Sequence, residues 1–114
     1  MLSKIHRLRK NTDFKAVFTK GRFAEDQFVK IKFYKNSINL TRFGFVVGLK
    51  FSKKSSFRNS IKRRLRAAVQ VLLKEIKPGH DIVIWPKNKT ADAKYRELAD
   101  ALKNLFVEND LLLI

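Results

Sequence analysis

Closely spaced basic residues between positions 53 and 66 form the part of the sequence best suited to binding a polyanion. Arg58, Lys62 and Arg66 recur every four residues, so a helix would carry them as a ridge along one side. Like charges at this spacing destabilise an isolated helix by about 0.2–0.5 kcal/mol per pair, and phosphate groups would relieve that repulsion. Lys53 and Lys54 lie just before the ridge, where the free N–H groups of a helix N-terminus also favour anions. We therefore predict a phosphate-binding helix, with a solvated basic surface as the alternative.

A second pattern alternates aromatic and basic side chains. Gln27–Lys35 has the period of two that is typical of a strand. Val29, Ile31 and Phe33 form its core side. The other side carries Phe28, Lys30, Lys32 and Tyr34. Flat rings on which bases stack, together with cations that follow the backbone, are what a site for single-stranded nucleic acid requires.

The sequence shows no group of residues suited to catalysis by the protein itself. It contains no cysteine, and His6 and His80 have no neighbouring ligands at a metal-binding spacing. No nucleophile–base pair or glycine-rich phosphate loop is visible. We therefore predict no catalytic residue, no metal site and no small-molecule substrate.

The charge of the chain is strongly and unevenly positive. The formal net charge is +16, and residues 27–74 hold thirteen Lys and Arg without a single Asp or Glu. Residues 75–114 are nearly neutral, with six basic and seven acidic side chains. A charge this far from zero destabilises the compact state, so it usually serves a polyanionic partner. The apolar runs are far too short to span a bilayer and no secretory signal is visible, so we expect a cytoplasmic protein without a membrane partner.

Hydrophobic periodicity predicts the elements that would position these residues. Helical patterns cover Asn11–Lys20, a long segment after Ser52–Ser56 that runs to about Lys77, and a last segment that starts near Thr90. Strand patterns cover Gln27–Lys35, Arg42–Lys50 and Asp81–Trp85, with a weaker one at Arg22–Ala24. A strand after the long helix implies a crossover with parallel pairing. We predict one domain over residues 1–114, an α/β (α+β) two-layer sandwich of order α-β-β-β-α-β-α with a mixed central sheet and a crossover helix.

The same periodicity predicts the residues of the core. The long helix would bury Ile61, Leu65, Val69, Leu72 and Ile76. The last helix would bury Tyr95, Leu98, Leu102, Leu105 and Phe106, and the strand Arg42–Lys50 would direct Phe43, Phe45, Val47 and Leu49 to one side. The run Asp81–Trp85 is apolar after its first residue, which is typical of a strand covered on both faces.

The basic helix resembles a motif of a known family. Arg58-Asn59-Ser60-Ile61-Lys62-Arg63-Arg64-Leu65-Arg66 is similar to the signature helix of the bacterial ribonuclease P protein. Other segments similar to that family, Arg7–Gly21, Phe43–Lys50 and Asp81–Ile84, fall in the expected order. Ser60 stands where the family usually has an arginine and Gly48 where a serine is more usual, so this chain has one guanidinium fewer for an RNA contact.

The resemblance implies a function, two partners and two sites. In that family a catalytic RNA removes the 5′ leader of precursor tRNA, with magnesium held mainly by the RNA and no cofactor bound by the protein alone. The family fold is ribosomal protein S5 domain 2-like. The residues that would bind the catalytic RNA are Lys53, Lys54, Arg58, Asn59, Lys62, Arg63 and Arg66. The residues that would line a cleft for the single-stranded leader, between the first helix and the sheet, are Phe14, Phe18, Phe28, Lys30, Lys32 and Tyr34.

The residues alone leave other interpretations open. A ribosomal protein or an RNA chaperone could use the same basic helix without a role in tRNA processing. A protein bound to anionic lipid would need apolar side chains opposite the charges and free for lipid, whereas Ile61, Leu65 and Leu72 are expected in the core. Phe14 and Phe18 share a helical face with Val17 and could belong either to the core or to the cleft.

Overall fold

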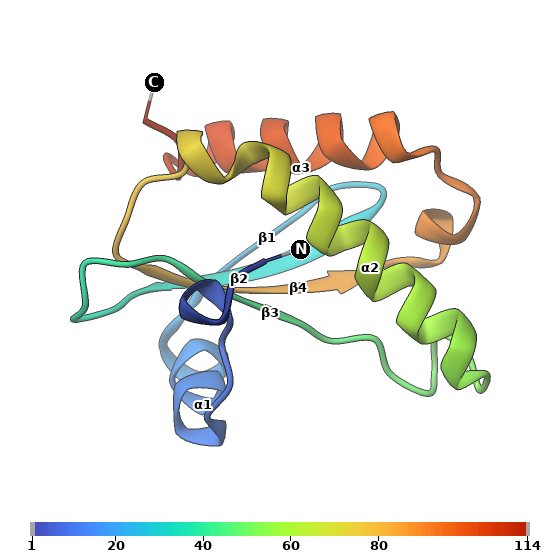
Figure 1. Cartoon of the computed structure of the whole chain (residues 1–114), viewed down its shortest axis with the longest axis horizontal. Coiled ribbons are helices and arrows are strands. Elements are labelled where there is room, and N and C mark those ends of the chain that lie inside the picture. Colours follow the sequence, from blue (N-terminus) through green and yellow to red (C-terminus); the bar gives the residue numbers. More distant parts are fainter. Residues whose placement is uncertain (1, 114) are drawn as a thin grey trace.

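A four-stranded mixed sheet carries helices on both of its faces (Figure 1). The computed structural model describes residues 2–113. The helices are α1 (Asn11–Lys20), α2 (Ser55–Leu72) and α3 (Tyr95–Glu108), with short 3-10 helices η1 (Lys4–His6), η2 (Leu73–Glu75) and η3 (Asn88–Asp92). The strands are β1 (Arg22–Glu25), β2 (Val29–Lys35), β3 (Arg42–Phe45) and β4 (His80–Pro86).

The strand order in the sheet is β1-β2-β4-β3, so the last strand in sequence lies between two earlier ones. The β3–β4 pair is parallel and is connected through α2, whereas β1–β2 and β2–β4 are antiparallel. The predicted crossover helix, the mixed sheet and the short first strand are therefore confirmed. Residues 7 and 8 extend the sheet beside β3, because the Leu8 N–H donates to the Phe43 carbonyl at 2.8 Å.

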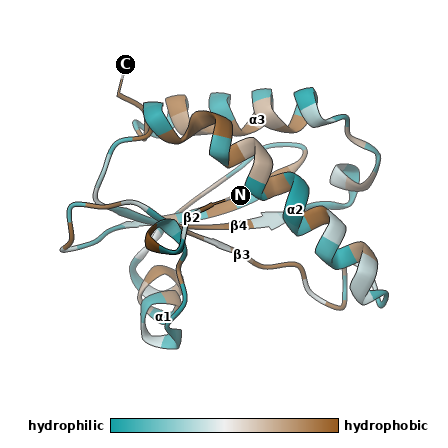
Figure 2. Ribbon diagram, in the orientation of Figure 1, coloured by the Kyte–Doolittle hydropathy of each residue, from teal (hydrophilic) through white to brown (hydrophobic). Residues whose placement is uncertain are grey.

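One face of the sheet packs against α2 and α3, which lie side by side over it (Figure 1). The apolar stripe of α2 turns toward the strands, and polar residues occupy its outer side (Figure 2). Ile31 of β2 and Ile84 of β4 are fully buried beneath the helices. The predicted stripe of the long helix, Ile61, Leu65, Val69, Leu72 and Ile76, is buried as expected. This layer contains most of the hydrophobic core.

The opposite face is covered only in part, by α1. Val17 of α1 and Val83 of β4 are fully buried against each other and against Leu8. The two-layer arrangement of sheet and helices thus gains a short third layer on the second face. Because α1 has only ten residues, it leaves one end of this face uncovered.

Several predicted boundaries differ from the structure. The strand predicted to reach Lys50 ends at Phe45, and Leu49, expected in the core, is 70% exposed. The Val46 N–H still donates to the Ile84 carbonyl at 3.0 Å, but the chain then turns, with the Gly48 carbonyl accepting from the Phe51 N–H. The long helix becomes a 3-10 turn after Leu72 instead of continuing to Lys77.

The C-terminal helix also starts later than predicted. Thr90 lies in η3, and α3 begins at Tyr95, which is 44% exposed rather than buried. Its hydroxyl reaches across the surface to donate to the Ala67 carbonyl of α2 at 3.1 Å. The other predicted core residues of this helix, Leu98, Leu102, Leu105 and Phe106, are buried.

Candidate nucleic-acid interface

Strand register arranges the side chains on the α1 face in three rows across the sheet. The first row is Tyr34, Asp81 and Arg42, the second is Phe23, Lys32, Val83 and Gly44, and the third is Glu25, Lys30 and Trp85. Because β-strand side chains alternate between faces, every residue in these rows shares the face that carries α1. The position of α1 then decides which rows are open to a ligand.

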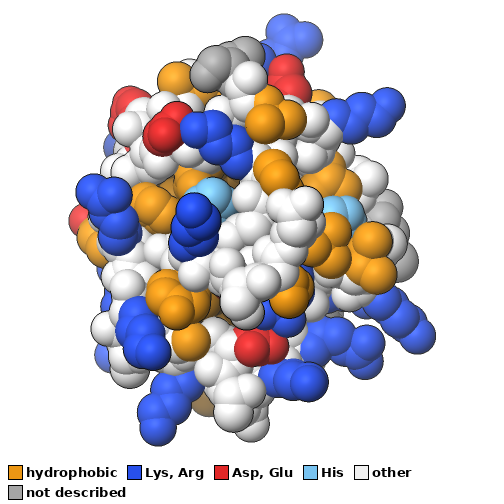
Figure 3. Space-filling view, turned by 90° about the vertical axis from the view of Figure 1, so that its left-hand side faces the viewer, with side chains coloured by type: hydrophobic (Ala, Val, Ile, Leu, Met, Phe, Trp, Pro, Cys, Tyr) orange, Lys and Arg blue, Asp and Glu red, His pale blue; other side chains and the backbone are white. Residues whose placement is uncertain are grey.

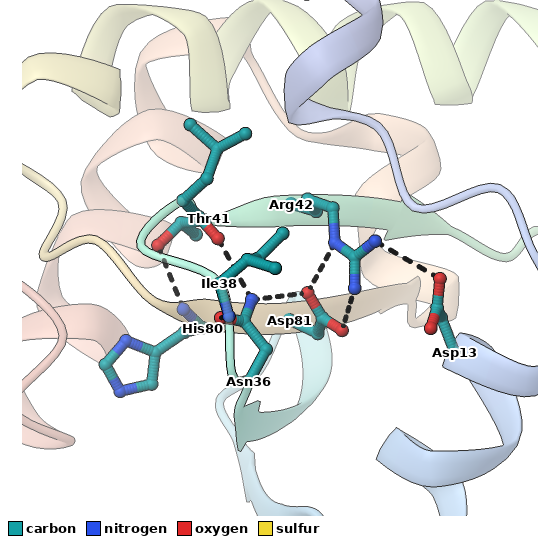
Figure 4. A network of polar contacts seen from close by, with 8 residues as sticks. Asp13, Asn36, Ile38, Thr41, Arg42, His80 and Asp81 are labelled. Atoms are coloured by element: carbon teal, nitrogen blue, oxygen red, sulfur yellow. Dashed lines mark hydrogen bonds and ion pairs between the residues drawn. The ribbon is translucent and has the colours of Figure 1, made fainter.

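A buried ion-pair network fixes α1 over the first row (Figure 4). Asp81 is 2% exposed and accepts from Arg42 twice, at 2.9 Å from Nε and 2.7 Å from Nη2. Arg42 Nη1 also donates to Asp13 of α1 at 3.2 Å, and Asn36 Nδ2 donates to Asp81 at 2.8 Å. The hydrogen bonds that Arg42 donates to the Asp81 carboxylate raise the pKa of Arg42 above its ordinary value. The guanidinium therefore joins the first helix to the edge strand β3 and the central strand β4.

Close packing holds α1 over the second row. Gly44 lies directly beneath Phe14, and a Cβ atom at this glycine would be 2.5 Å from the ring carbon Cε1. Any larger residue at position 44 would have to displace the ring. Phe14 also packs with Val17 and Val83. The first helix thus covers the first row and the Val83–Gly44 end of the second row. It leaves Phe23, Lys32 and the third row open to the groove.

An open groove of about 1240 Å³ lies over the third row. It runs from β1 across β2 and β4 to the segment that follows β3. Its basic lining residues are Lys30, Lys32, Lys50, Lys87 and Lys89, and its aromatic ones are Phe23, Phe51 and Trp85. Cations and exposed rings in one hollow are the combination that single-stranded nucleic acid requires.

Aromatic rings connect α1 with this groove. The ring centroids of Phe14 and Phe18 are 6.1 Å apart, and those of Phe18 and Trp85 are 5.6 Å apart. Phe18 is 40% exposed and Phe23 is 52% exposed. Lys32 Nζ donates to the Phe18 carbonyl at 2.8 Å, which links β2 to the end of the helix. Rings with open faces therefore follow one another from the helix into the groove.

The six residues predicted for the cleft divide into three groups. Lys30 and Lys32 line the groove, and Phe18 borders it through Trp85. Phe14 and Tyr34 pack in the apolar cluster beneath α1. Phe28 is separate from the others, because it precedes β2 and packs against the core on the α3 side. Asp26 Oδ1 accepts hydrogen bonds from the N–H groups of Phe28 and Val29. This turn interrupts the strand alternation that had predicted Phe28 on the same face as Lys30 and Lys32.

Sequence reasoning missed several residues of the groove. These are Phe23, Val46, Lys50, Trp85, Lys87 and Lys89. Trp85 was predicted to be covered on both faces, but it is only partly buried and lines the groove. Because Trp85 is two residues from Val83, the strand pattern correctly places both side chains on the same face of β4. No sequence pattern indicates that β4 pairs with β2, and this pairing brings Trp85 beside Lys30.

The basic ridge of α2 lies away from this groove lining, on the helix layer. Arg66 places its guanidinium carbon 5.8 Å from the centre of the Phe45 ring, and Arg58 Nη1 donates to the Ser52 carbonyl at 2.8 Å. Lys62 between them is partly buried. The structure thus places the three predicted ridge residues along one side of the helix. Asn59 and Arg63 are exposed beside them, as are Lys53 and Lys54 before the helix.

The segment before α2 is held by stacked rings. Phe51 and Phe57 are 5.7 Å apart with an interplanar angle of 13°. The Lys54 N–H donates to Ser52 Oγ at 3.1 Å just before the helix begins. None of the ion pairs found within residues 2–113 involves a basic side chain of α2. The charges of this helix are therefore available to an external anion.

The end of the molecule at the β2–β3 turn has a different surface (Figure 3). Basic side chains lie around its margin and also nearer its middle, a few acidic ones lie among them, and hydrophobic side chains are scattered over the face. The acidic side chains reduce the positive potential of this face. The groove and the α2 ridge are thus the stronger candidates for nucleic-acid binding.

Within residues 2–113, no three His, Cys, Asp or Glu side chains are arranged to hold a metal ion. His6 Nδ1 forms a hydrogen bond with the Thr41 carbonyl oxygen at 2.8 Å, which helps to hold the N-terminal segment in place. Among the helices of the same residues, none combines the length and the apolar character needed to cross a bilayer.

Comparisons with known proteins agree with the geometry. The family model described as Ribonuclease P matches residues 2–109. The ribonuclease P protein component of Pseudanabaena sp. is 35% identical, covering 98% of this chain and 97% of that protein, and that of Alkaliphilus oremlandii is 33% identical, covering 95% and 94%. The solved RNase P protein of Thermotoga maritima has a TM-score of 0.79 at 31% identity, covering 87% of this chain and 93% of that one. The chain belongs to the ribonuclease P protein family.

Proposed function

We propose that this protein binds the catalytic RNA of ribonuclease P through α2 and the single-stranded 5′ leader of precursor tRNA through the groove beside α1. Membership in the family supports the first partner, since a ribonuclease P protein component works with the ribonuclease P RNA. The enzyme is then an endoribonuclease in which the RNA performs catalysis. The protein would act in the cytoplasm as its binding subunit.

The observation that carries the leader assignment is the uncovered third row of the sheet. Lys30 and Trp85 lie side by side there, and Phe23 borders the same groove. A base can stack on an exposed ring whatever its identity, whereas hydrogen bonds to base edges would select a sequence. Leaders of different sequence could therefore use one groove.

The chemistry of cleavage is assigned to the RNA. Magnesium ions held mainly by that RNA would supply the nucleophile and stabilise the leaving oxygen. The protein residues would lower the repulsion between two polyanions and would orient the leader. The expected effect of the protein is therefore greatest where magnesium is scarce.

Reconstitution with a bacterial ribonuclease P RNA at low magnesium tests this function. The protein should stimulate 5′ processing of precursor tRNA, and the gain should be larger for a substrate with a leader than for one without. Binding of the RNA without any stimulation would instead support the alternative function, an RNA chaperone or a ribosomal protein. Equal stimulation with and without a leader would contradict the assignment of the groove.

A further inference from the structure

Among the described residues that line the groove, Glu25 is the single acid beside five lysines. It lies on the edge strand β1, opposite Lys30 of β2. Its Oε1 atom forms an ion pair with Lys87 Nζ. A carboxylate at this place is unexpected, because the protein carries 26 basic and 10 acidic side chains and the groove is suited to a polyanion.

The position of this ion pair follows from the backbone. Lys87 follows the last residue of β4, and its N–H donates to the Phe28 carbonyl at 2.7 Å, which anchors its backbone beside the start of β2, the strand that pairs with β1. The Lys87 hydrogen bond lowers the pKa of Glu25, and the charge of Lys30 lowers it further. The carboxylate is therefore ionised at neutral pH. It neutralises a cation that would otherwise face the groove.

We propose that Glu25 acts as an internal competitor for phosphate, occupying on Lys87 the place that a phosphate of the bound strand would take. This inference rests on the proposed function of the groove and adds a residue that sets its affinity. A strand that reaches Lys87 has to open the ion pair and then lies close to a freed carboxylate. Both effects weaken binding at the β1 edge, whereas Lys30 and Lys32 remain available.

A moderate affinity suits a groove for a strand that is released after every turnover. The α2 helix provides the contrast within the same molecule. It lies in the stretch 27–74, which contains no acidic residue, and it is proposed to bind the permanent RNA partner. The two surfaces thus differ in whether an acid competes for their cations.

The test compares Glu25→Gln with Glu75→Gln, which removes the same charge from an exposed residue of η2 that lines no part of the groove. The probe is a short single-stranded RNA without secondary structure, titrated against the whole protein at several salt concentrations. Glu25→Gln should tighten binding about two- to fivefold, the range that an exposed ion pair gives. Because one more cation becomes available, the plot of the logarithm of the binding constant against the logarithm of the salt concentration should steepen by about 0.7. Glu75→Gln should change neither the affinity nor the salt dependence appreciably.

Lys87→Gln separates competition from general charge repulsion. If Glu25 occupies Lys87, Lys87→Gln should weaken binding more in the Glu25→Gln background than in the native protein. An equal gain from Glu25→Gln with and without Lys87 would overturn the inference, as would an unchanged affinity. Equal melting temperatures would exclude misfolding of the variants. Failure of the native protein to bind single-stranded RNA would instead contradict the proposed function of the groove.

Discussion

Arg42 and Asp81 form a bidentate ion pair between neighbouring parallel strands, and the same guanidinium reaches Asp13 of the first helix. Asp81 is buried, whereas the Arg42 side chain is 21% exposed. The pair therefore links the sheet to α1, whose Phe18 contacts Trp85 at the border of the groove. We therefore expect the stability of the fold to depend on this contact.

Replacing Arg42 should destabilise the fold. Arg42→Met keeps much of the side-chain volume but leaves the buried Asp81 carboxylate with Asn36 as its remaining side-chain partner. Loss of one partner of a buried pair should lower the free energy of unfolding by about 3 kcal/mol, measured by urea denaturation. Asp13→Asn, which removes only the more exposed ion pair between Arg42 and Asp13, should lower the free energy of unfolding clearly less. Equal losses for the two variants would contradict the central role of the Arg42–Asp81 pair.

The close approach of Phe14 to Gly44 predicts a strong coupling between these two positions. Gly44→Ala would place a methyl group against the Phe14 ring, so we expect a loss of about 1–3 kcal/mol in the free energy of unfolding. In a Phe14→Ala background the same change should cost much less, because the ring is gone. A double-mutant cycle of unfolding free energies measures this coupling. Additive losses would show that α1 does not rest on Gly44.

The elements of the fold followed from periodicity because most segments bury one regular face. The stripe from Ile61 to Ile76 and the alternation of Val29, Ile31 and Phe33 were sufficient to predict α2 and β2. The predictions fail where a local contact overrides the hydrophobic periodicity. The turn made by Asp26 redirects Phe28, and the loss of a pairing partner after Val46 leaves Leu49 in solvent.

The site was less predictable than the fold because it depends on strand order. Sequence patterns gave the basic ridge of α2 and the lysines of β2. They did not show that β4 lies between β2 and β3, so Trp85 was not predicted beside Lys30. They also left open how far α1 extends over the sheet, which decides that Tyr34 is covered and Phe23 is exposed.

Phe23 offers the cleanest test of stacking in the groove. It lies on an edge strand and is 52% exposed, so Phe23→Ala should leave the melting temperature nearly unchanged. If a leader base stacks on this ring, binding of precursor tRNA by the holoenzyme should weaken by about 1–3 kcal/mol, with leaderless tRNA unaffected. Val107→Ala, at an exposed residue of α3, is the matched control and should affect neither substrate. A loss of equal size for both substrates would exclude a specific contact with the leader.

The ridge of α2 should determine how binding of the catalytic RNA depends on salt. Each phosphate contact that Arg58, Lys62 and Arg66 make releases counterions, so changing all three to alanine should flatten the logarithmic salt slope by about two units. The control changes Lys74, Arg96 and Lys103, three exposed basic residues outside α2, and removes the same total charge. If long-range attraction alone were responsible, both triple variants would lose the same affinity and slope. A larger loss from the ridge, at an unchanged melting temperature, would mean that these side chains contact the RNA directly.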